Sequence, residues 1–143
     1  MLRLKRRVKS LQPPIFLWID PMYNYDQSNI FARILRGEIP NRTAMESAHT
    51  LVFHDIHPQA PIHVLAIPKG PYVNFDHFAA EASAEEILDF HRTAAAVCAL
   101  LGIAPGEGYR AITNAGMNGM QEVPHYHMHI LGGRVLGRLV ERA

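Results

Sequence analysis

Apolar and polar residues alternate with two different periods along the chain, and each change of period marks a predicted element. A short amphipathic helix is predicted over residues 29–36, because Ser28 offers an N-terminal cap and Gly37 offers a stop. A longer helix is predicted over residues 83–101, because its first four residues (SAEE) form a capping box and a glycine follows it. The pattern therefore predicts one short and one long helix.

Five short apolar runs have the length and alternation expected of strands. They cover residues 44–47, 51–55, 62–67, 109–114 and 123–131. The two prolines in HPQAP, residues 57–61, force a turn between the second and third runs, because proline lacks the N–H that a sheet ladder needs. Short strands with hairpin-length links predict an α+β fold with an antiparallel five-stranded sheet.

Size and composition restrict the class of protein. The 143 residues suffice for one domain with a core, and 48% apolar and 19% charged residues indicate a globular rather than a disordered chain. No apolar run approaches the roughly 20 residues that span a bilayer, so no membrane partner is expected. The single cysteine, Cys98, excludes a disulfide framework and a multi-cysteine zinc site. We expect a cytoplasmic protein.

The charge is concentrated at the N-terminus. Five of the 14 basic residues lie within the first nine positions, and the remaining nine face 13 acidic residues, which leaves the rest of the chain at about −4. A nucleic-acid partner is therefore not expected. We expect residues 1–27 to form a flexible extension, with the domain over residues 28–143. Organelle targeting by the basic segment and a true start at Met22 are the alternatives.

The sequence HYHMH at residues 125–129 places a histidine at every second position. Because strand residues alternate between faces, His125, His127 and His129 are predicted to share one face, with the two residues between them turned the other way. The apolar side explains how this strand is held on the core. It does not explain three imidazoles.

Three interpretations of the histidines compete. Nine histidines in the chain make one chance pair ordinary, but three in alternation are not expected by chance. A strand rise of about 3.3 Å separates the outer two by roughly 13 Å, so all three cannot bind one metal ion, although a pair with His63 stays open. Nucleophilic catalysis by one imidazole, with neighbours that orient it and move protons, uses all three. We favour this third interpretation.

HYHMHILGG is similar to the histidine triad motif of the HIT superfamily, in which His-x-His-x-His precedes apolar residues. Three further stretches agree in order, namely NIFARILRGEIP, FHDIHPQAPIHVLAIPK and GYRAITNAGMNGMQEVPH. Together with LGGR they resemble the histidine triad nucleotide-binding (Hint) branch over residues 28–134. The resemblance implies a HIT-like fold and a homodimer formed through the long helix and an edge strand.

The resemblance also implies an activity: hydrolysis of purine nucleoside phosphoramidates, with no cofactor and no metal. His127 would attack the α-phosphorus and expel the amine, giving a nucleotidyl-histidine that water then cleaves. His129 and His63 would contact phosphate and carry protons, while the backbone carbonyl of His125 would orient the nucleophile. The identity of the general acid stays open.

Seven further positions match nucleotide contacts of the family. Asp55 matches the carboxylate that grips the ribose hydroxyls, Asn114 a polar contact near ribose and phosphate, and Gln121 a phosphate contact. The apolar walls around the base correspond to Phe31, Ile39, Phe53 and Ile56. Core packing is an equal explanation for those four.

Two departures from the family pattern bear on function. Glu122 replaces a small hydroxyl residue, and Met120 replaces a glycine in the same loop. Both affect the expected leaving-group contacts and rate more than the reaction class. The alternative functions are a dinucleoside polyphosphate hydrolase, a nucleotidylyl transferase, or a nucleotide-binding regulatory module in which Glu122 has quenched turnover. A metal-dependent enzyme is the least favoured.

Overall fold

The structure of the protein is a computed structural model that describes residues 23–141. Residues 1–22, most of the predicted extension, lie outside this range. The elements in chain order are α1 (Ile30–Leu35), β1 (Thr43–Glu46), β2 (Thr50–His54), β3 (Ile62–Pro68), α2 (Phe75–Glu81), α3 (Ala84–Leu100), β4 (Tyr109–Ile112) and β5 (Met128–Gly132). No helix in the described range combines the length and hydropathy needed to cross a bilayer.

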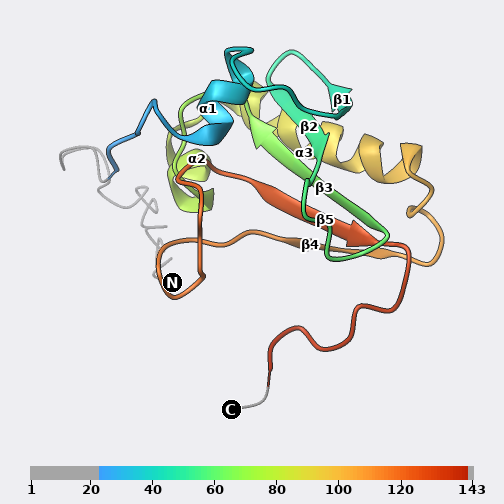
Figure 1. Cartoon of the computed structure of the whole chain (residues 1–143). Coiled ribbons are helices and arrows are strands. Elements are labelled where there is room, and N and C mark those ends of the chain that lie inside the picture. Colours follow the sequence, from blue (N-terminus) through green and yellow to red (C-terminus); the bar gives the residue numbers. More distant parts are fainter. Residues whose placement is uncertain (1–22, 142–143) are drawn as a thin grey trace, which may run out of the picture.

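The strands form one antiparallel sheet in the order β1-β2-β3-β5-β4, so the predicted α+β fold with five antiparallel strands is confirmed. The long helix α3 lies across one face of the sheet (Figure 1). On the opposite face, Phe31 of α1 packs with residues of β2 and β3. The C-terminal β5 sits between β3 and β4 because antiparallel pairing brings residues 62–68 beside residues 128–132. This long-range pairing sets the position of the site.

Each face of the sheet carries its own apolar cluster, as period-two alternation requires. On the α3 side, Val52 and Val64 pack with Phe90 and Val97 of the helix. On the opposite side, the intervening strand residues Leu51, Phe53, Leu65 and Ile67 pack around Phe31 of α1. Burial of both faces holds β2 and β3 at the centre of the domain.

The helix boundaries follow local hydrogen bonding. Asn29 caps α1, with its Oδ1 accepting from the N–H of Ala32 at 2.9 Å, so the predicted cap at Ser28 is wrong by one residue. The capping box of α3 is present as predicted, with both Ser83–Glu86 hydrogen bonds at 3.1 Å. Gly37 follows α1 with φ 77°, a conformation that glycine adopts without steric cost.

One element was not predicted, and two strands were predicted too long, since β4 already ends at Ile112 rather than at residue 114. The seven-residue α2, capped by Asn74, has too few turns for its period to stand out. The predicted strand over residues 123–131 is wrong in its first half, because β5 begins only at Met128. Pro124 has no N–H to offer a ladder, and the His125 N–H bonds to the Val123 carbonyl at 2.9 Å in a tight turn.

Candidate active site

His127 lies just before β5 and is held by its own neighbours. Its Nδ1 is 2.6 Å from the backbone carbonyl oxygen of His125. A carbonyl can only accept, so Nδ1 carries the proton and Nε2 keeps its lone pair. The ring is 6% exposed and meets the edge of Phe31 at a centroid distance of 5.1 Å. Thr113, just beyond β4, donates its hydroxyl to the His127 carbonyl at 3.2 Å.

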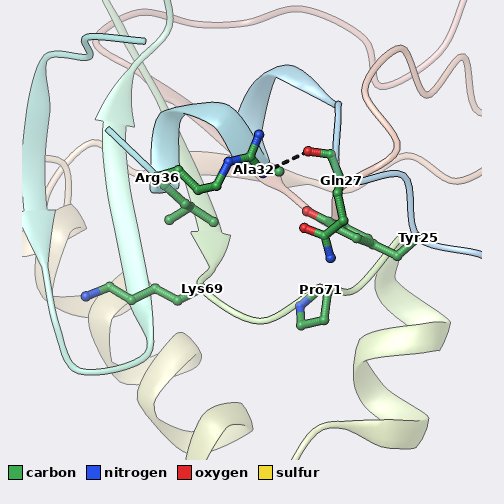
Figure 2. A pocket seen from close by; sticks show the side chains of 7 residues that line it. Tyr25, Gln27, Ala32, Arg36, Lys69 and Pro71 are labelled. Atoms are coloured by element: carbon green, nitrogen blue, oxygen red, sulfur yellow. Dashed lines mark hydrogen bonds between the residues drawn. The ribbon is translucent and has the colours of Figure 1, made fainter. Parts of the chain in front are cut away.

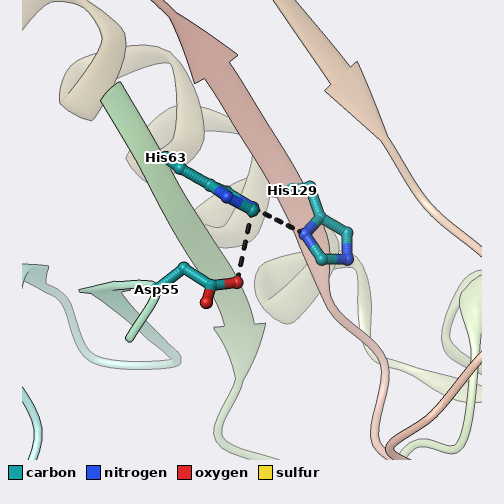
Figure 3. A group of neighbouring side chains, drawn as sticks. All are labelled: Asp55, His63 and His129. Carbon is teal, nitrogen blue, oxygen red and sulfur yellow. Dashed lines mark hydrogen bonds and ion pairs between the residues drawn. The ribbon is translucent and has the colours of Figure 1, made fainter. Parts of the chain in front are cut away.

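His63 on β3 and His129 on β5 face each other across paired strands. The N–H of Gln59 donates to His63 Nδ1 at 3.1 Å, so the ring proton of neutral His63 lies on Nε2. That Nε2 is 2.9 Å from His129 Nδ1 and 3.4 Å from Asp55 Oδ2 (Figure 3). His63 therefore donates to His129, whose own proton lies on Nε2. Figure 3 shows the three side chains converging from β3, β5 and the end of β2.

His125 is fully buried and lies outside any strand. Its Nε2 donates to the Pro68 carbonyl at 2.8 Å, which leaves Nδ1 as an acceptor. The hydroxyl of Tyr25 lies 2.5 Å from that Nδ1 and donates to it. The described residues that precede α1 thus contact the triad directly.

The prediction that the three histidines share a face rested on a strand that is not formed at residues 123–127. Even so, the backbone stays alternating: Tyr126 enters the α3-side core, whereas His125 and His127 both contact the ring of Phe31. Side-chain packing, rather than hydrogen bonding in a sheet ladder, thus keeps Tyr126 on one side and the two histidines on the other. Of the three triad histidines, only His129 lies in a strand.

Burial lowers the pKa of all four histidines of this group. It lowers the pKa of His125 to about 4, and that of His129 to about 4 with additional repulsion from His127 and His63. Burial also lowers the pKa of His127, although the His125 carbonyl and the negative charges of Asp55 and Glu122 oppose it. The pKa of His63 is lowered by burial against the pull of Asp55. The rings are therefore neutral near pH 7 and can act as nucleophile or acid–base groups.

The three predicted polar contacts differ in how they are engaged. Asp55 follows β2, and its Oδ1 accepts from the N–H of His57 at 2.8 Å. Gln121 ties its loop to the segment before α2, because Nε2 donates to the carbonyls of Val73 (2.6 Å) and Val123 (3.0 Å). Asn114 is half-buried, just after β4. Only Asp55 is brought into contact with the histidines.

The four predicted apolar wall residues divide into two pairs. Phe31 and Phe53 are 7% and 5% exposed and belong to the cluster on the far side of the sheet from α3. Ile56 is 81% exposed and Ile39 is half-buried. Phe31 and Phe53 therefore support the site from beneath, while the two isoleucines present surface.

The loop before the triad carries a strained residue. Met120 has φ 55°, a left-handed conformation that costs a side chain about 1–2 kcal/mol and that glycine adopts freely. Its side chain is 78% exposed, so packing does not hold it there. Where the family pattern has glycine, this chain therefore holds a methionine in a conformation that suits glycine better.

A separate cavity of about 180 Å³ lies beside α1 (Figure 2). It is lined by Tyr25, Gln27, Ala32, Leu35, Arg36, Lys69 and Pro71. Its two cations are engaged, since Arg36 pairs with Glu38 at 3.0 Å and Lys69 Nζ with Glu46 at 2.8 Å. Neither offers an unneutralised charge to a ligand.

The sequence did not reveal the groups that fix the tautomers of His125 and His63. Tyr25 is separated from His125 by 100 positions, and no local pattern links them. The other groups are backbone atoms, namely the carbonyl of Pro68 and the N–H of Gln59, which no side-chain motif can reveal. They were findable only from the folded arrangement.

Comparisons with known proteins identify the family of this chain. The family model described as the HIT domain matches residues 36–136. The chain belongs to the HIT domain family. A HIT-like protein of Azospirillum brasilense is 49% identical over 118 residues, which cover 82% of this chain and 96% of that protein. The purine nucleoside phosphoramidase of Escherichia coli (strain K12) is 41% identical over 119 residues, covering 80% and 94%.

Solved structures of HIT proteins share the fold. A HIT family hydrolase from Clostridium thermocellum superposes with a TM-score of 0.73 at 37% identity, covering 81% of this chain and 99% of that one. A histidine triad protein from Clostridium difficile gives a TM-score of 0.72 at 32% identity, covering 82% and 100%. The resemblance on which the sequence argument relied is therefore confirmed at the level of family and fold.

Proposed function

We propose that this HIT protein hydrolyses the P–N bond of purine nucleoside phosphoramidates, with His127 as the nucleophile. The observation that carries the proposal is the 2.6 Å contact between His127 Nδ1 and the His125 carbonyl, which leaves Nε2 as a neutral, buried lone pair. A relative that is 41% identical bears the name purine nucleoside phosphoramidase, which supports this substrate class.

In the first step Nε2 of His127 forms a bond to the α-phosphorus and the P–N bond breaks. The departing amine nitrogen must receive a proton. His129 is our candidate donor, because its Nδ1 accepts from His63 at 2.9 Å and its Nε2 therefore carries a hydrogen. For the charges to balance, His63 takes up a proton from solvent at Nδ1 when the substrate binds, passes its Nε2 proton to His129 and ends as a neutral ring. The Asp55 carboxylate, 3.4 Å from His63 Nε2, stabilises the positive charge of His63 before this transfer.

In the second step water attacks the phosphorus of the nucleotidyl-histidine. His129 now accepts the proton of that water, and the P–N bond to His127 breaks to release the mononucleotide. The His125 carbonyl holds the His127 ring through both displacements, which keeps the attacking lone pair in one direction. His125 thus acts through its backbone, and its side chain stays bonded to Pro68 and Tyr25.

The nucleoside would occupy the surface beside Asp55. The carboxylate would accept from the two ribose hydroxyls, and Ile39 and Ile56 would contact the base. Phe31 and Phe53 would back this surface. Asn114 and Gln121 complete the proposed set, although Gln121 must release Val73 or Val123 before its amide can donate to a phosphate oxygen.

The test is steady-state hydrolysis of a fluorogenic adenosine phosphoramidate by the wild-type protein and by His127→Ala. We expect the variant to lose at least about 10³-fold in kcat. The matched control is His91→Ala, an exposed histidine of α3 whose Nδ1 bonds only the Ile87 carbonyl and whose loss should leave the rate unchanged. An unaltered rate in His127→Ala would reject the mechanism.

The same assay separates the alternative functions. Faster turnover of diadenosine polyphosphate than of the phosphoramidate would favour the dinucleotide hydrolase. Binding of AMP without turnover of either substrate would favour the regulatory module. Glu122, an exposed carboxylate next to Gln121, is the residue to replace by serine in that case.

We also propose that the protein is a homodimer. β4 lies at the edge of the sheet, and its Tyr109 is 50% exposed. On the outer face of α3, Leu88 and Leu100 are 50% and 62% exposed. Exposed apolar residues on a helix and an open edge strand are both features that a second copy would cover. Equilibrium sedimentation should give twice the mass of one chain.

A further inference from the structure

Asp55, His63 and His129 together form a set of metal-ligand atoms. Each residue offers one nitrogen or oxygen, and these atoms all lie within 4.8 Å of one another. They come from three separate segments, and His63 is 3% exposed while Asp55 is 17% exposed in its side chain. The three atoms therefore converge by folding, on a partly buried spot, and not as a chance cluster of surface acids.

The spacing fits a tetrahedral ion. Ligands about 2.0–2.1 Å from a zinc ion lie about 3.3 Å apart along each edge of the tetrahedron. Asp55 Oδ2 and His63 Nε2 are already 3.4 Å apart. His63 Nε2 and His129 Nδ1 are 2.9 Å apart, so their rings need to separate by only about 0.4 Å by the same metal–ligand distances. The ligand atoms of Asp55 and His129 lie within 4.8 Å and must close to about 3.3 Å by the same metal–ligand distances, which rotation of the partly exposed Asp55 side chain can supply.

We propose that a transition-metal ion of the zinc type binds to Asp55, His63 and His129 and reversibly inhibits the hydrolysis. Two imidazoles and one carboxylate suit Zn²⁺ and its neighbours, whereas Mg²⁺ and Ca²⁺ require mainly oxygen ligands. Three protein ligands leave a fourth position for water. The binding part of this proposal stands alone, and the inhibitory part rests on the proposed function.

Binding requires one proton to move. His63 must present a lone pair at Nε2, so the hydrogen there shifts to Nδ1 and the ring stays neutral. Nδ1 then no longer accepts from the N–H of Gln59, now 3.1 Å away. Gln59 is exposed, so its N–H can turn to water at small cost. The bond between His63 and His129 is replaced by two bonds to the metal.

Inhibition follows from the atoms that the ion occupies. His63 Nε2 and His129 Nδ1 are the two ends of the proposed proton path, and the ion takes the place of the shared hydrogen. Asp55 is the proposed partner of the ribose, so the ion and the nucleotide compete for its carboxylate. Zn²⁺ should therefore raise the apparent KM as well as lower the rate, and a chelator should restore both.

Binding is measured directly by calorimetric titration of the full chain with ZnCl₂ and by the visible absorption of CoCl₂. We expect one ion per chain, with MgCl₂ giving no signal. Asp55→Asn keeps an acceptor for the N–H of His57 but loses the charge, and it should weaken Zn²⁺ binding at least about tenfold. His129→Gln should do the same, with circular dichroism reporting the fold of each variant.

The matched control is His77→Gln. His77 Nε2 and Glu81 Oε2 lie 2.7 Å apart on α2 and form a histidine–carboxylate pair outside the proposed site. His77→Gln should bind Zn²⁺ as the wild type does. If His77→Gln loses the ion while Asp55→Asn and His129→Gln keep it, the assignment is overturned.

His127→Ala separates this proposal from the proposed function. His127 is not among the three ligands, so the variant should bind Zn²⁺ normally while it fails to hydrolyse the substrate. A wild-type protein that hydrolyses the phosphoramidate but gives no Zn²⁺ or Co²⁺ signal would overturn the metal site and leave the activity intact. Bound Zn²⁺ with undiminished turnover would overturn the inhibitory role.

Discussion

The hydroxyl of Tyr126 gives the clearest stability prediction. The side chain is 1% exposed and lies among Phe78, Phe90 and Phe75, at ring-centroid distances of 5.0, 5.1 and 6.2 Å. Among the described residues no group hydrogen-bonds its hydroxyl oxygen. Burial raises the pKa of Tyr126 to about 12, which reflects the same apolar surroundings. We expect Tyr126→Phe to stabilise the protein.

The magnitude follows from two opposing effects. A buried polar group without a partner costs about 1–3 kcal/mol, and the substitution removes that cost. The lost oxygen makes a handful of van der Waals contacts worth about 0.1–0.2 kcal/mol each, while the three ring contacts are kept. The free energy of unfolding should therefore rise by about 1 kcal/mol, which corresponds to about 3–4 °C in Tm for a chain of this size.

Tyr25→Phe is the matched control, because it deletes the same atom from a hydroxyl that has a partner. Tyr25 donates to His125 Nδ1 at 2.5 Å, and its loss leaves that buried nitrogen without a donor. This variant should lose about 1–3 kcal/mol of stability. Urea unfolding at one fixed protein concentration, followed by circular dichroism, compares both variants with the wild type.

The signs of the two changes carry the test. If Tyr126→Phe destabilises the protein by 1 kcal/mol or more, as an order of magnitude for a lost hydrogen bond, then the hydroxyl has a partner and the reasoning fails. Equal changes in the free energy of unfolding for Tyr126→Phe and Tyr25→Phe would likewise refute it, because the prediction depends on a hydrogen-bond partner at Tyr25 and none at Tyr126.

Two further predictions concern the loop and the triad. Met120→Gly should raise the free energy of unfolding by about 0.5–1 kcal/mol in the same urea assay. The substitution relieves the strain of φ 55°, while the greater conformational entropy of glycine in the unfolded chain offsets part of that stabilisation. A decrease in the free energy of unfolding would mean that contacts hold the Met120 side chain. Burial lowers the pKa of His125 to about 4, below the unfolded value near 6.5, so folding favours the neutral ring. The resulting stability is present above pH 6.5 and is lost as the pH falls toward 4, by about 1.4 kcal/mol per pH unit. Because burial also lowers the pKa of His63, His127 and His129, thermal unfolding between pH 7.5 and 4.5 should show at least this slope. His125→Asn should reduce the slope by about 1.4 kcal/mol per pH unit.

The sequence alone was sufficient where the chemistry is local. The capping box at Ser83 and the glycine after each predicted helix fixed the helix ends to within a residue or two, because caps act on adjacent backbone groups. Short, nearly continuous apolar runs identified β2 and β3, whose residues are buried on both faces. The ordered motifs identified the family.

Local pattern failed where a distant segment decides the backbone. Residues 123–127 alternate as a strand does, yet Pro124 and the bond from the Tyr126 N–H to the Tyr72 carbonyl, at 2.7 Å, take them out of the sheet. The helix α2 is too short for its period to be recognised, and its Phe78 becomes a core residue through contacts with Phe90 of α3 and with Tyr126.

The tautomers of the site were likewise beyond the sequence. The motif supplies imidazoles, but a neutral ring can carry its proton on either nitrogen, and only the facing group selects one. Here the carbonyl of Pro68 and the N–H of Gln59 make that selection for His125 and His63. The His125 carbonyl, which makes it for His127, is the one such group that the family resemblance implied. Residues 66 positions apart meet to give the His63–His129 contact, which arises from the pairing of β3 with β5. Composition and motif determined which groups are present; the antiparallel sheet decided which atoms they face, because hydrogen-bond direction is a property of three-dimensional arrangement.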